Sequence, residues 1–113
     1  MKHVHYTDVD AENVDVEGAK DAKIRWLITK KDGATNFTMR LFDLQPDGHT
    51  PLHQHDWEHE VFIVAGSGEL RNKEEKDSFK KGDVIFVPSM EWHQFVNTGD
   101  ELLQFICVIP YME

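Results

Sequence analysis

Short apolar runs separated by turn-forming residues limit most strongly how this chain can fold. The runs are rich in Val, Ile and Phe, and Gly, Pro, Asn or Asp stand between them, for example at 45–48 and 66–68. Such residues favour extended backbone and turns respectively, a pattern typical of strands in a sandwich or barrel. We therefore expect an all-β fold, an antiparallel barrel or jelly roll. The expected strands cover residues 24–29, 37–44, 60–64, 84–87, 92–96 and 102–109.

The length of 113 residues predicts a single domain, because domains typically contain about 100–150 residues. Residues 1 to about 22 show weak periodicity and are expected to form an extended N-terminal arm or an edge strand. Helical periodicity is limited to a turn expected at 19–23.

The charge of the chain excludes some partners. Lys and Arg number 12 against 21 Asp and Glu, a formal charge of −9, which disfavours a nucleic-acid partner. No apolar run approaches the roughly 20 residues that a membrane-spanning helix needs. The single cysteine, Cys107, cannot form an internal disulfide, and the first residues lack the apolar stretch of a secretory signal, so a cytoplasmic location is expected.

Histidines cluster in one short stretch: four of the seven lie between positions 49 and 59. His53 and His55 are two residues apart, so on an extended strand their imidazoles face the same way. His59 would lie roughly 13 Å farther along a straight strand, too far to share an ion with them, which predicts a turn at 56–58. After that turn either His59 or Glu60 can face back, and parity leaves the choice open.

A fourth imidazole is expected from a later strand, in which His93 and Phe95 share a face. Imidazole is a common ligand of divalent metals, so the pattern predicts a metal site. Histidine with its ordinary pKa of about 6.5 competes with protons, which predicts that metal affinity falls steeply below neutrality.

Two ordered motifs resemble those of the cupins, specifically the small single-domain metal-binding kind. The first places a Gly before a His-x-His pair, followed by a Glu and a Gly; the second contains a Gly, a Pro, a His and an Asn. The matching residues are Gly48, His53, His55, Glu60 and Gly66, then Gly82, Pro88, His93 and Asn97. Gly48 is one residue closer to His53 than usual, and Met90 replaces a Gly, departures that affect loops.

The resemblance implies a double-stranded β-helix, the cupin jelly-roll barrel, over residues 1–113, and a metal held by His53, His55 and His93. Some small cupins with a His-x-His-x-x-x-His run use four histidines, which favours His59 as the fourth ligand, with Glu60 as the alternative. One divalent transition metal ion per chain is expected, with manganese or iron favoured and nickel, copper or zinc also compatible.

The expected function is metal-dependent binding of a small molecule. Similar small cupins include dioxygenases, so one hypothesis is an oxidoreductase acting on an enolisable or phenolic substrate. The alternative is a metal-containing module that binds a sugar or carboxylate without turnover. The candidate pocket residues are Arg40, Phe95, Phe105 and Cys107. A homodimer is also expected, because residues 3–16 carry strand-forming residues without an obvious partner in one barrel.

Overall fold

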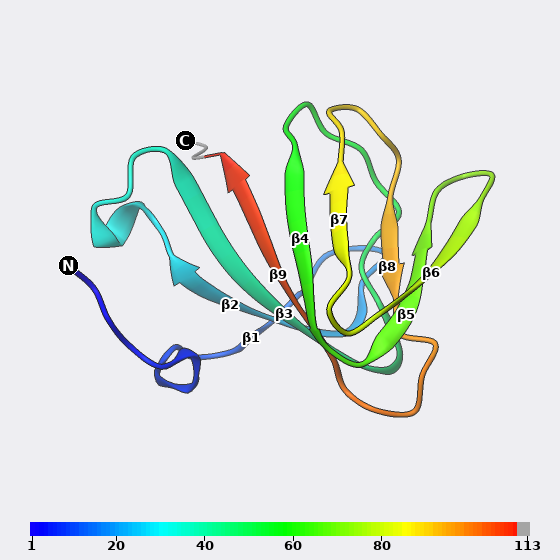
Figure 1. Cartoon of the computed structure of the whole chain (residues 1–113), viewed down its shortest axis with the longest axis horizontal. Helices are drawn as coiled ribbons and strands as arrows, with labels where there is room; N and C mark the ends of the chain where they lie inside the picture. Colours follow the sequence, from blue (N-terminus) through cyan, green and yellow to red (C-terminus); the bar gives the residue numbers. More distant parts are fainter. Residues whose placement is uncertain (111–113) are drawn as a thin grey trace.

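The computed structural model describes residues 1–110 and is built almost entirely of antiparallel strands (Figure 1). The strands are β1 Glu12–Asn13, β2 Lys20–Ile28, β3 Phe37–His49, β4 His59–Ala65, β5 Ser67–Arg71, β6 Lys76–Lys80, β7 Val84–Val87, β8 Gln94–Val96 and β9 Leu103–Pro110. Two short 3-10 turns, η1 Tyr6–Asp8 and η2 Lys30–Asp32, complete the regular structure. The all-β prediction is confirmed. Within this part of the chain, no helix is long and apolar enough to cross a membrane.

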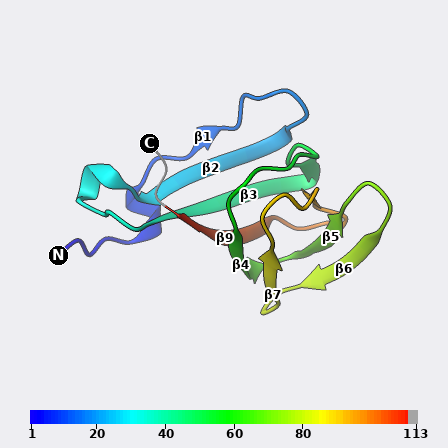
Figure 2. The same ribbon diagram turned by 90° about the horizontal axis from the view of Figure 1, so that it is seen from above.

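The strands form one sheet that curls on itself in the order β6-β5-β8-β3-β9-β4-β7, with β2 on the other edge of β3 and β1 outside β2. Figure 2 shows β1, β2, β3 and β9 side by side, with β4 to β7 beneath them. β3 belongs to both halves, because it pairs with β9 over 37–44 and with β8 only at His49. This curled sheet is the jelly-roll barrel that the sequence predicted.

Alternation along the central strands directs one face of each into the barrel. On β9, every second residue from Leu103 to Ile109 is buried, so Phe105 and Cys107 point inward. Ile63 from β4 and Leu44 from β3 are fully buried beside them. These buried residues therefore form a packed core inside the barrel, next to a cavity.

Two local predictions were wrong, and one hairpin was not predicted. The turn expected at 45–48 lies inside β3, where the strand bends with Asp47 at a positive φ of 68°. A side chain on Gly48 would meet carbonyl oxygens of Gln45 and Asp21, so the bend needs a glycine there. The turn expected at 19–23 is the start of β2, and the hairpin β5–β6 was not expected because its exposed residues are mostly polar.

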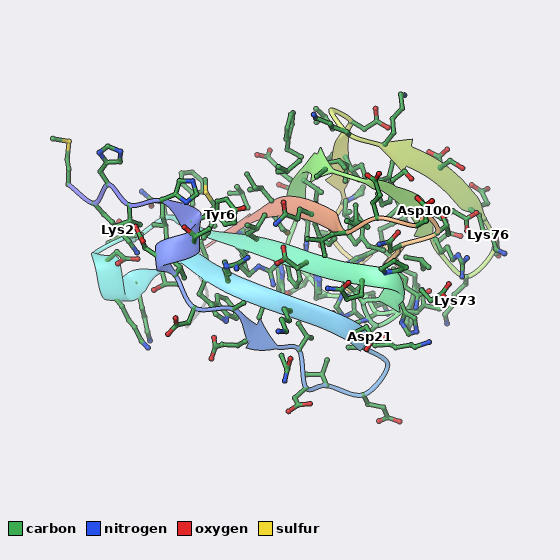
Figure 3. The ribbon with its side chains drawn as sticks, turned by 90° about the horizontal axis from the view of Figure 1, so that it is seen from below. Lys2, Tyr6, Asp21, Lys73, Lys76 and Asp100 are labelled. Carbon is green, nitrogen blue, oxygen red and sulfur yellow. The ribbon has the colours of Figure 1, made fainter. Side chains whose placement is uncertain are left out.

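The N-terminal arm pairs within its own chain, contrary to the expectation that it lacks a partner. Glu12 and Asn13 pair with β2, and Lys2 forms an ion pair of 2.9 Å with Asp32. Figure 3 shows Lys2 and Tyr6 at the end of the molecule opposite Lys73 on the β5–β6 hairpin. Residues 12–17 then help to line the cavity.

Candidate metal centre

Two backbone hydrogen bonds hold the first and last histidines of the cluster together. The amide of His53 donates to the carbonyl of His93 at 3.1 Å, and the amide of His93 donates back at 2.9 Å. Residues paired in this way project their side chains to the same side of the sheet. The His53 and His93 rings accordingly lie 4.7 Å apart, centroid to centroid.

His55 and His59 complete the cluster from either side of a bend at Asp56 and Trp57, as the predicted turn required. β4 begins at His59, which is buried and faces inward with Val61 and Ile63. Glu60 is exposed on the opposite face of β4. The structure thus places His59 at the cluster and directs Glu60 away from it.

Three of the four imidazoles, those of His53, His55 and His93, converge, and His59 adjoins this group beside His55. The Nε2 atoms of His53 and His93 are 3.1 Å apart, and those of His55 and His59 are 2.7 Å apart. His53, His55 and His93 each offer a nitrogen within 4.8 Å of the others. Two ligands at right angles, with metal bonds of about 2.1 Å, are separated by about 3.0 Å, close to both measured spacings.

The opposite ring nitrogens have partners that favour this arrangement. The carbonyl of Glu91 lies 2.8 Å from Nδ1 of His93, and the carbonyl of Trp57 lies 3.2 Å from Nδ1 of His55. A carbonyl only accepts, so Nδ1 carries the proton in both rings and the Nε2 lone pair is free. A shared proton between neighbouring rings would explain each close pair separately. A metal ion explains why the rings of His53, His55 and His93 converge, so these three residues fit a divalent metal.

Burial keeps the imidazoles neutral. Desolvation, followed by the like charges of neighbouring histidines, lowers the pKa of His53 to about 4. Desolvation and then the Arg40 guanidinium lower the pKa of His59 to about 2. The pKa values of His55 and His93 are also lowered, mainly by desolvation. Neutral imidazole is the form that binds metal, so proton competition begins at a lower pH than the sequence predicted.

These pKa shifts predict how acid affects the metal-free protein. The unfolded chain takes up protons at histidine near pH 6.5, whereas His53 in the folded chain does so only near pH 4. Stability is therefore intact above pH 6.5 and lost as the pH falls toward 4. We expect the Tm of metal-free protein to fall by about 10 °C or more between pH 6.5 and 4.5.

Thermal unfolding monitored by circular dichroism at half-unit pH steps measures this loss. His53→Asn should flatten the profile, whereas His3→Gln, a change at an exposed histidine far from the cluster, should leave it unaltered. A Tm that stays constant over this range would contradict the buried, neutral state of the imidazoles.

His53, His59 and His93 line a cavity of about 650 Å³. All four predicted pocket residues, Arg40, Phe95, Phe105 and Cys107, line it. Trp26 and Phe42 also line the cavity, although no pattern in the sequence indicated them. Trp26 pairs across the sheet with Arg40, so the correct β2–β3 register would have placed Trp26 at the cavity.

Two neighbouring side chains, Cys107 and Trp57, contact imidazoles of the cluster. Nδ1 of His59 is 2.9 Å from the Cys107 sulfur, and Arg40 Nη2 donates to the same sulfur at 3.1 Å. The Trp57 ring stacks on His55 at 4.0 Å with an interplanar angle of 1°. These neighbours fix the orientation of two imidazoles, as groups around metal ligands commonly do.

The sequence model of the cupin domain, Cupin_2, matches residues 40–109, which include both predicted motifs. This chain is a cupin. A curated relative, the oxalate-binding protein of Thermotoga maritima, is 33% identical over 96 residues, which cover 81% of this chain and 78% of that protein. Another, the 1-methylthio-D-xylulose 5-phosphate methylsulfurylase of Rhodospirillum rubrum, is 32% identical over 71 residues, 63% of this cupin. This chain therefore spans only about half the length of that enzyme, 46%.

Solved structures resemble this cupin over nearly its whole length. The polyketide cyclase RemF from Streptomyces resistomycificus superposes with a TM-score of 0.93 at 39% identity, covering 99% of this chain and 80% of that one. A predicted oxalate decarboxylase from Thermotoga maritima gives a TM-score of 0.85 at 27% identity, covering 98% and 100%. The family prediction is confirmed, and the relatives act on or bind chemically different small molecules.

Proposed function

We propose that this cupin is a metal-dependent enzyme that cyclises an enolisable polycarbonyl compound. The observation that carries the proposal is the group of His53, His55 and His93, with His59 beside His55, at a largely apolar cavity that His53, His59 and His93 line. We propose these four imidazoles as the metal ligands, with Glu60 outside the set. A divalent metal held there would supply Lewis-acid polarisation of a carbonyl oxygen.

The cavity suits a flat organic substrate. Phe42, Phe105 and Phe95 form a continuous row of rings, with centroids 5.1 Å and 4.6 Å apart and interplanar angles of 18° and 27°. Such a wall orients a planar conjugated molecule by stacking. A volume of about 650 Å³ lies in the usual range for organic ligands.

Cyclisation is favoured by the likeness to the polyketide cyclase, which is 39% identical over 99% of this chain. In an aldol cyclisation, an enol carbon bonds to a carbonyl carbon of the same molecule, and loss of one water completes the ring. The new carbon–carbon bond and the released water both come from atoms of the substrate, so no external oxidant is consumed. The aromatic wall would hold the polycarbonyl substrate folded, and arm residues 12–17, which line the same cavity, would limit the entry of water.

The second candidate is binding without turnover, favoured by the 33% identity to the oxalate-binding protein. A small dicarboxylate would occupy only part of the cavity and would not contact the whole row of phenylalanines. The dioxygenase hypothesis shares the enolisable substrate with the cyclase but requires oxygen. A single probe compound can therefore distinguish cyclisation, dioxygenation and binding without turnover.

The probe is an aryl 1,3,5-triketone mixed with metal-loaded protein, with product mass and dissolved oxygen measured together. We expect a product lighter by one water, formed faster than in buffer and without oxygen uptake. The His53→Ala/His55→Ala variant is the control and should match buffer. Oxygen uptake with a mass gain would replace the cyclase by a dioxygenase, and saturable binding without turnover would replace it by a binding module.

We also propose that this cupin is a homodimer. The outer face of β4 and β7 is apolar yet open: Phe62, Val84 and Phe86 are 47%, 77% and 54% exposed, and Phe62 pairs with Val84. Apolar patches of this kind commonly mark interfaces, and a second copy of the same face is self-complementary under two-fold symmetry. Because β1 already pairs with β2, this face supports self-association better than the N-terminal arm does.

Light scattering at micromolar concentration checks the dimer. We expect twice the chain mass for the full protein, twice the shortened mass after deletion of residues 1–16, and a single chain mass for Phe86→Lys. Loss of the dimer only in the protein that lacks residues 1–16 would show that the arm forms the interface. A monomeric full-length protein would exclude both arrangements.

A further inference from the structure

Arg40 reaches the cavity from the middle of the sheet. It lies on β3 between its cross-strand partners Trp26 on β2 and Cys107 on β9. Its guanidinium lies over the Phe42 ring at 5.0 Å and over the Trp26 ring at 5.8 Å. The cation is therefore held between aromatic faces at the cavity wall, in a position set by the strands rather than by a loop.

This guanidinium lacks a counter-charge in the part of the chain that the structure describes. Arg40 makes one hydrogen bond there, from Nη2 to the Cys107 sulfur, and its buried Nε–H has no acceptor. Arg25, on the outer face of the neighbouring strand, instead pairs with Asp43 at 3.0 Å. A partly buried charge without a partner is costly, so the unpaired Arg40 is unusual beside its paired neighbour.

The surroundings of Arg40 do not neutralise it. The four histidines of the cluster are neutral, and a bound divalent metal would add positive charge. The acidic residues that line the same cavity are Glu12, Asp15 and Glu17, all exposed on the arm at its mouth. An anion in the cavity is thus favoured by the guanidinium, and a divalent metal bound at the histidines would add to this attraction.

The aromatic wall connects the guanidinium to the histidine cluster. Arg40 lies over Phe42, the rings continue through Phe105 to Phe95, and Phe95 lies 6.3 Å from the His93 ring. A planar molecule stacked on this row extends from the guanidinium to the metal centre. We propose that Arg40 binds an ionised oxygen of the substrate, so this cupin selects flat conjugated anions, either carboxylates or ionised enols and phenols.

This assignment rests on the proposed function, since it places the anion on the substrate of the metal site. Arg40 acts as a specificity-determining residue, because the planar guanidinium donates two parallel hydrogen bonds to a carboxylate or one charged bond to an enolate. The metal centre is not needed for this contact. The preference for an anion should therefore persist in metal-free protein.

The test uses chelator-treated protein and two probes of nearly equal shape, 2-naphthoate and its neutral analogue 2-naphthamide, with affinities measured by calorimetry. We expect wild-type protein to prefer the naphthoate by about tenfold or more. Arg40→Met should abolish that preference by weakening naphthoate binding far more than naphthamide binding, and Arg40→Lys should retain part of it. The matched control is Arg25→Met, the same change on the next strand but outside the cavity, which should keep the full preference.

Equal binding of the two probes, no binding of either, or an Arg40→Met variant that retains the preference would overturn the assignment. If Arg40→Met does not fold, the Arg40→Lys variant decides, since it keeps the charge and removes the planar fork. A surviving naphthoate preference with no triketone turnover would refute the cyclase alone. Triketone turnover without a preference for naphthoate would refute only the role of Arg40.

Discussion

Alanine at both His53 and His55 should remove the bound metal and leave the barrel folded. The two side chains supply half of the proposed ligands, and the remaining imidazoles of His59 and His93 cannot hold an ion at comparable affinity. The largest fully buried side chains, among them Phe105, Leu44 and Ile63, lie in the core and do not depend on the two imidazoles. We expect metal content to fall below about one-tenth of the wild-type value.

Elemental analysis of protein purified without added metal measures this loss and identifies the metal in the wild-type protein. Circular dichroism and Tm establish that the variant is folded. His49→Ala is the matched control, because His49 belongs to the same histidine-rich stretch but its Nδ1 contacts the Thr50 carbonyl at 3.2 Å instead of the cluster. Stoichiometric metal in the double variant would refute the site.

His59→Gln should weaken metal binding by tenfold or more, about the effect of losing a ligand, whereas Glu60→Gln should change it little. The reason is the geometry of β4: the His59 Nε2 is 2.7 Å from that of His55, and Glu60 is exposed on the other face. Glutamine retains most of the volume of histidine, so the packing beside Cys107 changes less than with alanine.

Competition with a coloured chelator gives the dissociation constants of both variants. Trp57 offers a second signal, because its ring stacks on His55 and a redox-active metal nearby should quench its fluorescence. The opposite order of effects, with Glu60→Gln the weaker binder, would show that a carboxylate completes the site and that β4 rotates when the metal binds.

The sequence predicted the strands that bury a regular apolar face and missed those that do not. β7 was predicted to the residue, and β4 and β9 within one or two residues, because Val, Ile and Phe dominate them. β5 and β6 expose mostly polar residues and contribute mainly Gly68 and Phe79 to the interior. β3 continues through Pro46, where its backbone bends between the two halves of the sheet, and residue type alone indicates a turn there.

The choice between His59 and Glu60 could not be made from the sequence for a physical reason. Alternation identifies the inner face of a strand only when the other face is polar. On β4 the outer residue Phe62 is as apolar as the inner residues Val61 and Ile63, so both registers satisfy the pattern. The register is fixed by long-range pairing, in which His59 lies opposite Val87 on β7.

The pocket residues also divide into those that the sequence indicated and those that it did not. Phe95, Phe105 and Cys107 could be proposed because each shares a strand face with a ligand or with another of the group. The sequence also raised Arg40, but gave no means to establish that its charge is unpaired, since that depends on every neighbour in space. Trp26 and Phe42 needed the β2–β3 register, which a single sequence does not contain.

The backbone bridge between His53 and His93 affects how the centre exchanges its ion. The two residues are separated by 40 positions, yet two amide–carbonyl bonds keep them in register without help from the imidazoles. Much of the ordering entropy of the site is therefore already lost when the chain folds. At the proposed site, release and capture of an ion would require rotation of side chains rather than refolding of the loop, so we expect one molecule to be able to change its metal with the ions that its surroundings supply.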